Sequence, residues 1–347
     1  MHKERIRVSC EKIVITGGCG FLGRFIAGRF LETGNCPLLK VIDLKANGAA
    51  LFDFADDKNV EIVLGADVCD YDSMVDEFAG ADCVIHLAGI VSFSLKDELL
   101  LRSVNAGGTR NVLRAAGDNG VKCVIHVSSV AALGYNDDKD NPVNEEFQFD
   151  WNIAAKRKKF YMLTKHQADL EVEEFRRQGL NIVVVYPGLM FGPGDVANSA
   201  RLIKAISSRK IPFNMPGGTN IVDVRDVAAA IVGIVKNGIN RGDYLLSGAN
   251  LTFSRVNGTI AEALATKPPA LTLPRFLNGP LFRLLLFIES VSKNKLALTA
   301  DNLDSAFKFR YFDNAKAKSQ LDWRPQISFR QTIKDTIEWM KNDGRLD

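Results

Sequence analysis

The feature that most constrains the fold is an alternation of short apolar runs with longer helical stretches. The apolar runs, rich in β-branched residues, span Lys12–Thr16, Lys40–Asp43, Glu61–Leu64, Cys83–Leu87, Lys122–Val127 and Asn181–Tyr186. The helical stretches between them include Phe21–Glu32, Ser103–Asn119 and Lys158–Gln178. Short continuous apolar strands joined by helical crossovers predict a parallel sheet covered by helices on both faces. The expected fold is therefore α/β, with a doubly wound sheet.

The second half of the chain has a looser pattern. With 347 residues, 46% of them hydrophobic, the chain can bury a large core. Beyond about residue 191, turns rich in proline and glycine, such as FGPGD and NMPGGTN, separate short elements. We predict a large domain over residues 1–190 and a smaller substrate-binding lobe over residues 191–347, in which residues 221–250 return to the sheet.

Charge and cysteine usage restrict the partners. The chain has 44 basic and 41 acidic residues, giving a net charge of +3, and neither sign forms a long block. This excludes the basic footprint of a nucleic-acid-binding protein and favours a small-molecule ligand. No cysteine pair has metal-site or redox-motif spacing, and no secretory signal precedes the first strand, so we expect free thiols and a cytoplasmic protein. The cysteines are Cys10, Cys19, Cys36, Cys69, Cys83 and Cys123.

One apolar segment raises the question of membrane contact. Residues 271–291 are rich in Leu and Phe, but charged residues and prolines interrupt them, so they do not predict a spanning helix. The nearby cations Arg275, Arg283, Lys293 and Lys295 are compatible with a helix lying on a membrane surface. We favour instead a helix that packs over the substrate cleft or in a subunit interface.

A glycine-rich turn follows the first strand. The segment Ile13–Gly23, IVITGGCGFLG, places Gly17, Gly20 and Gly23 between a strand and a helix that begins with Phe21 and Leu22. This spacing suits a tight turn, close approach of a phosphate, and close packing of the helix on the strand. The alternative is an ordinary turn. We interpret the segment as the phosphate-binding loop of a Rossmann dinucleotide site.

Carboxylates and small residues after the next strands support that interpretation. Asp43 lies twenty positions past Gly23, where a carboxylate binds the ribose hydroxyls of an adenosine and repels a 2′-phosphate. NAD is therefore favoured over NADP, although Lys45 could pair with such a phosphate. We further predict cofactor contacts after the third and fourth strands, at Asp67, Val68, Leu87, Ala88 and Gly89.

Several motifs together resemble a known enzyme family. TGGCGFLG, HLAG, VNAGGT, HVSS, Tyr161-x-x-x-Lys165 and YPG occur in the order seen in extended short-chain dehydrogenases/reductases, and the resemblance covers nearly the whole chain. The later FGPGD, MPGGTNIVDVRDVAAAI and LDWRP resemble most the branch of dihydroflavonol 4-reductases and 3β-hydroxysteroid dehydrogenases. The resemblance implies an NAD(P)-dependent oxidoreductase that forms a homodimer through two helices per subunit.

The catalytic set implied by this resemblance is Ser129, Tyr161 and Lys165. Tyr161 and Lys165 are four positions apart and share a helix face, so the ammonium can lower the phenol's pKa from its ordinary value near 10. Ser129 ends the fifth strand, where its hydroxyl can hold a substrate carbonyl. Ser128 is the competing serine and a predicted cofactor contact. A Y-x-x-x-K sequence by itself usually marks a solvated helix face.

Further residues follow from the same resemblance. Asn105 is expected to position active-site groups, with a helix cap as the alternative. Pro187 and Gly188 are expected beside the nicotinamide. His86 and His126, at corresponding strand ends, lack a third ligand, so we expect core residues and no metal.

The sequence leaves the substrate open. Substrate contacts are expected from residues 90–95, 133–150 and 190–191 and from the carboxyl-terminal lobe, and Val91, Phe93, Met190 and Phe191 favour an apolar alcohol or ketone. Arg201, Arg225 and Arg255 keep a sugar nucleotide open, and with it a 4-epimerase or dehydratase. A non-catalytic dinucleotide sensor is the remaining alternative, although such proteins usually lack the tyrosine or lysine.

Overall fold

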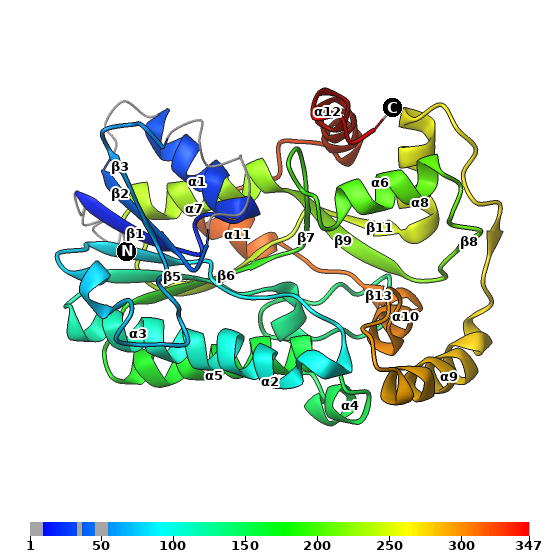
Figure 1. Cartoon of the computed structure of the whole chain (residues 1–347), viewed down its shortest axis with the longest axis horizontal. Coiled ribbons are helices and arrows are strands. Elements are labelled where there is room, and N and C mark those ends of the chain that lie inside the picture. The colour runs from blue at the N-terminus through cyan, green and yellow to red at the C-terminus, as the bar shows by residue number, and fades with distance from the viewer. Residues whose placement is uncertain (1–9, 33–36, 46–54, 347) are drawn as a thin grey trace.

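A seven-stranded parallel sheet forms the centre of the molecule (Figure 1). The computed structural model describes residues 10–32, 37–45 and 55–346. Across the sheet the strands are β10 (Gly242–Leu246), β6 (Ile182–Pro187), β5 (Cys123–Val127), β4 (Cys83–His86), β1 (Lys12–Thr16), β2 (Leu38–Asp43) and β3 (Val60–Leu64). Every neighbouring pair in this sheet is parallel. The predicted doubly wound α/β fold is confirmed.

Two helical layers cover this sheet. One layer contains α1 (Phe21–Leu31), α7 (Val224–Lys236) and α11 (Ala315–Gln320), and the other contains α3 (Gly108–Asp118) and α5 (Phe160–Arg177). Successive strand residues point to opposite faces, so Ile13 and Ile15 pack in the α1 and α7 core whereas Val14 packs in the α3 core. Burial on both faces explains why these strands are continuously apolar.

Short elements connect the strands and position the site. They are η2 (Val75–Phe78), η3 (Leu95–Asp97), α2 (Glu98–Leu101), the π-helical η4 (Arg102–Gly107), η5 (Val130–Leu133) and α4 (Trp151–Lys156). The single helix expected over Ser103–Asn119 therefore begins as a π-helical turn. The helix expected from Lys158 begins two residues later, because Lys158 has a φ of 52° that no α-helix accommodates.

The carboxyl-terminal lobe packs around a second, smaller sheet. In it β9 (Gly218–Asp223) pairs with β7 (Leu189–Phe191), β11 (Ala249–Thr252) and β13 (Phe309–Arg310). A third apolar core joins this sheet to α6 (Ser199–Ser207), α8 (Phe253–Ala263) and α12 (Phe329–Asn342). The remaining elements are β8 (Phe213–Asn214), β12 (Leu271–Thr272), η6 (Arg275–Leu277), α9 (Asn278–Val291) and α10 (Ala300–Ala306).

The structure bears on the expectations about membrane-spanning helices and about the cysteines. Among the described residues, no helix combines the length and apolarity needed to cross a bilayer. Five of the six cysteines are free thiols, and Cys36 lies outside the described residues.

Candidate active site

The turn between β1 and α1 requires glycine at two of the three predicted positions. Gly17 has a φ of 66°, and a Cβ there would lie 2.7 Å from the backbone of Ala88. A Cβ at Gly23 would lie 2.2 Å from the carbonyl oxygen of Gly18. Gly20 is the N-cap of α1 and no side chain caps that helix end. Its N–H groups therefore remain for an anion, as a dinucleotide phosphate requires.

The predicted adenosine contacts lie around this turn. Asp43 ends β2, and its Oδ2 accepts the N–H of Cys19 at 3.0 Å, which fixes a carboxylate beside the glycine turn. Asp67 accepts the N–H of Cys69 at 2.9 Å, and the carbonyl of Val68 accepts from Asn111 at 2.9 Å. Lys45 is exposed. The Asp43 bond thus ties the end of β2 to the glycine turn, and the Val68 bond ties the segment after β3 to α3.

Asn105 connects the segment after β4 to α5, because it binds both Ile90 and Thr164. Asn105 is 1% exposed, its Oδ1 accepts the N–H of Ile90 at 2.9 Å, and its Nδ2 donates to the Ile90 carbonyl at 3.1 Å. A Cβ at Gly89 would lie 3.2 Å from Asn105 Oδ1 and 3.5 Å from Lys165 Nζ. Asn105 lies inside the π-helical turn, so the helix-cap alternative is wrong. Such turns occur frequently at functional sites.

A second close approach occurs after β6. Pro187 ends this strand, and the N–H of Gly188 donates to the carbonyl of Leu246 at 3.2 Å. A Cβ at Gly188 would lie 2.3 Å from Oδ1 of Asn220, so only glycine fits between the two sheets. Leu87 and Ala88 likewise lie at the end of β4, where Ala88 meets Gly17.

The structure brings Ser129, Tyr161 and Lys165 together at the carboxyl edge of the sheet. The Ser129 hydroxyl forms a hydrogen bond with the phenol of half-buried Tyr161, and Oγ also accepts the N–H of Ala131 at 3.2 Å. Lys165 is buried one turn further along α5, with Nζ 3.4 Å from the carbonyl of Val127. Burial lowers the pKa of Lys165 to about 8. The three groups and the glycine turn thus lie at the edge where doubly wound sheets bind ligands.

The neighbouring serine has a different environment. The hydroxyl of Ser128 donates to Oδ1 of Asp169 at 2.8 Å, and its predicted contact with the cofactor stays a prediction. Burial raises the pKa of Asp169 to about 7, against the opposing effects of Ser128 and Lys165. Sequence reasoning missed Asp169, although it lies four positions after Lys165 on the same helix face.

The two strand-end histidines are neutral core residues. His86 lies between Thr16, 2.7 Å from Nδ1, and Thr109, 3.1 Å from Nε2, and burial together with the charge of Lys165 lowers its pKa to about 3. Burial also lowers the pKa of His126, whose ring lies 5.3 Å from that of His86.

The expected lowering of the Tyr161 pKa is not present in this structure. Burial raises the pKa of Tyr161, while the hydrogen bond from Ser129 and the positive charge of Arg310 act in the opposite direction. Arg310 was not predicted from the sequence. Its buried Nε has no hydrogen-bond partner among the described residues, and its positive charge acts on the phenol of Tyr161.

The predicted substrate-binding residues divide into two groups. Phe93 lies edge-on to the ring of Tyr161, with ring centroids 5.8 Å apart, and Met190 is half-buried. Phe191 is 1% exposed and packs near Phe329, so the expectation that it contacts substrate is wrong. Met190, the adjacent residue along β7, points to the other face and packs against the core of the large sheet.

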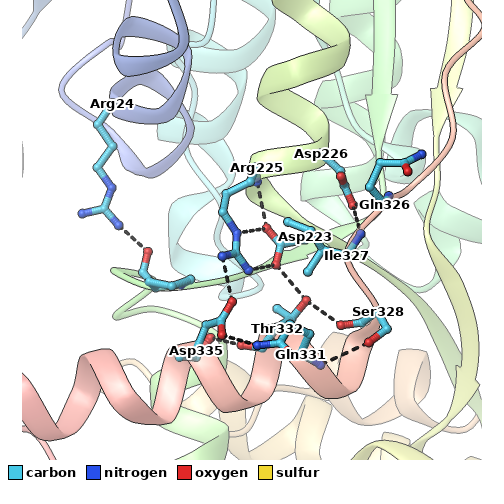
Figure 2. Close-up of polar contacts among 12 residues, drawn as sticks. Arg24, Asp223, Arg225, Asp226, Gln326, Ile327, Ser328, Gln331, Thr332 and Asp335 are labelled. Atoms are coloured by element: carbon cyan, nitrogen blue, oxygen red, sulfur yellow. Dashed lines mark hydrogen bonds and ion pairs between the residues drawn. The ribbon is translucent and has the colours of Figure 1, made fainter. Parts of the chain in front are cut away.

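Arg225 does not remain available for a diphosphate (Figure 2). Its guanidinium donates to both carboxylate oxygens of buried Asp223, at 2.9 and 2.7 Å, and pairs with Asp335 at 2.7 Å. Thr332 of α12 donates to the same Asp223 carboxylate at 2.8 Å. Figure 2 shows that this network clamps α12 onto the start of α7. Arg201 and Arg255 are exposed.

Comparisons with known proteins agree with this geometry. The model of the 3-beta hydroxysteroid dehydrogenase/isomerase family matches residues 14–240. A Synechocystis sp. protein named as a dihydroflavonol 4-reductase is 28% identical over 336 residues, which cover 95% of this chain and 94% of that protein. The Bos taurus sterol-4-alpha-carboxylate 3-dehydrogenase, decarboxylating, is 24% identical, with 94% and 92% covered.

A solved structure has the same fold. The dTDP-glucose 4,6-dehydratase DesIV from Streptomyces venezuelae, crystallised with NAD, superposes with a TM-score of 0.74 at 19% identity. The superposition covers 97% of this chain and 99% of that one.

Proposed function

The chain belongs to the 3-beta hydroxysteroid dehydrogenase/isomerase family, and we propose that it interconverts a secondary alcohol and a ketone on an apolar substrate. It is an oxidoreductase of the extended short-chain type that uses NAD(P), and Asp43 beside the glycine turn favours NAD. The observation that carries the proposal is the convergence of Ser129, Tyr161 and Lys165 beside that turn.

The cofactor supplies the chemistry of hydride transfer when bound, and the protein supplies the proton chemistry. Ser129 holds the substrate oxygen, and Tyr161 removes its proton during oxidation or returns it during reduction. Lys165 provides a cation one helical turn away, and Arg310 adds positive charge that favours the phenolate. Asn105 keeps the loop after β4 in place by binding both main-chain groups of Ile90.

The surroundings of Tyr161 favour an apolar substrate. The Phe93 ring contacts the Tyr161 ring, and Tyr161 also borders an apolar cluster that contains Tyr135, Phe149 and Trp151. The names of two relatives refer to a dihydroflavonol and to a sterol, and both are largely apolar ring compounds. We further propose, from the same resemblance, that the protein is a cytoplasmic homodimer.

Arg310 favours a second candidate function. A cation beside Tyr161 whose buried Nε lacks a hydrogen bond suits a substrate with an anionic group, such as the diphosphate of a sugar nucleotide. An epimerase or dehydratase would use the same tyrosine and return the reduced cofactor to its starting state. A non-catalytic sensor has the least support, because the chain has both Tyr161 and Lys165.

Cofactor turnover distinguishes these functions. The protein would be incubated with NAD and, separately, a 3β-hydroxysteroid, a dihydroflavonol-derived alcohol or dTDP-glucose, while the absorbance of reduced nicotinamide is recorded. Net NADH formation with an alcohol supports the proposal. A changed sugar without net NADH supports the epimerase or dehydratase.

Tyr161→Phe tests the catalytic assignment directly. Removing the hydroxyl that moves the proton should lower kcat by about 10²-fold or more, while NAD binding stays nearly unchanged. Tyr71→Phe, which removes an exposed phenol that donates to Asp118, is the matched control and should keep wild-type turnover. Equal kcat in wild type and Tyr161→Phe would refute the role.

A further inference from the structure

The outer side of α9 is apolar and exposed to solvent. The side chains of Leu284, Phe287 and Val291 are 55%, 66% and 63% exposed, and Phe276, just before the helix, is 77% exposed. Leu284, Phe287 and Val291 are three or four positions apart and therefore form one stripe along the same side of α9, while Phe276 lies in the short helix η6 before it. In Figure 1 this helix lies at the outer edge of the carboxyl-terminal lobe. The face is unusual, because a helix of a globular protein normally turns its apolar side inward.

The inner side of the same helix is held by polar contacts. Glu289 is 2% exposed, and its carboxylate accepts the N–H of Leu95 at 2.9 Å and the N–H of Ala300 at 3.2 Å. Asn278 donates to Asp304 at 3.0 Å. Rotating α9 about its axis to bury the apolar stripe would break the bonds of Glu289 to Leu95 and Ala300. The N–H groups of these residues would then lack an acceptor, so the bonds keep the stripe facing outward.

The exposed charges within residues 271–300 have one sign. Residues 271–300 contain four cations and a single carboxylate, that of Glu289, which is buried. Arg283, adjacent to Leu284, and Lys293, just past the helix, are exposed and form no ion pair within the part of the chain that the structure describes. Lys295 pairs with Asp97 but is still 61% exposed. The face that α9 offers to a partner is thus apolar with a positive border.

We propose that α9 docks the protein on an anionic lipid bilayer. The stripe enters the boundary between headgroups and acyl chains, and Arg283, Lys293 and Lys295 contact the lipid phosphates. With 14 residues, α9 is about 21 Å long, too short to span a hydrocarbon layer of about 30 Å, so it lies in the interface plane. This proposal goes beyond the proposed function and does not depend on it.

The position of α9 gives the docking a consequence for substrate access. Glu289 holds the N–H of Leu95, and two residues earlier Phe93 contacts the ring of Tyr161. The lipid-facing helix is therefore bonded to the loop that lines the catalytic phenol. An apolar molecule dissolved in the bilayer would reach Tyr161 along this loop.

Vesicle flotation of the full chain tests the proposal. The protein is mixed with vesicles of phosphatidylcholine alone or of phosphatidylcholine and phosphatidylglycerol in equal parts. The wild type should float with the mixed vesicles and much less with phosphatidylcholine alone, and added salt should weaken the binding. Failure of the wild type to float with the mixed vesicles would overturn the proposal.

Two pairs of substitutions separate the apolar and charged contributions. Leu284→Ser with Phe287→Ser should weaken binding to the mixed vesicles by about tenfold or more, since two apolar side chains no longer enter the lipid. Arg283→Glu with Lys293→Glu should weaken it by about fivefold per cation lost and abolish the preference for phosphatidylglycerol. All these side chains face solvent, so the variants should unfold at the wild-type temperature.

The control removes equally exposed apolar side chains elsewhere. Leu64 and Val196 are 52% and 51% exposed, and Leu64 ends β3 at the opposite end of the molecule in Figure 1. Leu64→Ser with Val196→Ser should bind vesicles as the wild type does. Equal binding by this control and the Leu284 and Phe287 variant would overturn the proposal. So would sedimentation showing that the stripe joins two copies of the chain while neither vesicle type is bound.

Discussion

The large sheet and the carboxyl-terminal lobe are held together in different ways. In the large sheet, strands and helices bury apolar side chains on both faces. The attachment of α10 to the start of α5 depends instead on buried ions: Lys159, 0% exposed, pairs with Asp301 at 2.6 Å and Asp304 at 3.0 Å. The large sheet is thus stabilised by apolar burial on both faces, whereas α10 is attached to α5 by buried charges more than 140 residues apart in the sequence.

Removing the central cation should have the largest effect. Lys159→Met leaves the buried carboxylates of Asp301 and Asp304 without their ammonium partner, which should lower the free energy of unfolding by about 3–5 kcal/mol. Chemical denaturation measures this loss. Because Lys159 lies two residues before Tyr161, the KM for substrate should also rise more than the dissociation constant for NAD.

An exposed ion pair in the lobe serves as the control. Arg330 pairs with Glu262 at 2.8 Å, and both side chains are more than half exposed. Arg330→Met should change the free energy of unfolding by less than about 1 kcal/mol. Equal losses in the two variants would contradict the distinction between the two regions.

In the large-sheet region, the free energy of unfolding should depend on pH through Asp169. Since the pKa of Asp169 is raised to about 7, the folded protein holds a proton there that the unfolded chain releases near its ordinary pKa of about 4. The free energy of unfolding therefore falls as the pH rises from about 4 to about 7, because the proton that Asp169 holds in the folded state favours folding less and less over this range. Asp169→Asn removes that dependence, so the variant should gain stability relative to wild type across this window, on the order of 2–4 kcal/mol.

Denaturation of both proteins at about pH 4 and about pH 8 checks the sign of this change. Asp140→Asn, at an exposed carboxylate in the loop before α4, provides the control. A difference between Asp169→Asn and wild type that stays constant with pH would show that Asp169 is not a buried, proton-holding group.

The smallest expected effect concerns cofactor choice. Asp43→Ala removes the carboxylate that would repel a 2′-phosphate, so the ratio of NADP to NAD affinity should rise by about tenfold. Loss of the bond to the Cys19 N–H should cost little stability by comparison, since that N–H lies at a partly exposed turn. Titration with both cofactors measures the ratio, and an unchanged ratio would remove the argument for NAD.

The sequence by itself determined the large sheet, the glycine turn and the helix that carries Tyr161 and Lys165. These features depend on local physics: continuous apolar strands, glycine where a Cβ has no room at residues 17 and 23, and a four-residue spacing that places Tyr161 and Lys165 on one helix face. Each of these features depends on a few residues close together in the sequence, so the sequence alone predicts it.

Only the tertiary structure decided which serine meets Tyr161, that Phe191 is a core residue, and that Arg310 and Asp169 border the site. It also showed that Arg225 is bound by Asp223 and Asp335, and that α9 turns its apolar side outward. These outcomes depend on contacts between distant segments. A side chain's partner across such a distance is set by packing geometry, which residue type and local spacing do not encode.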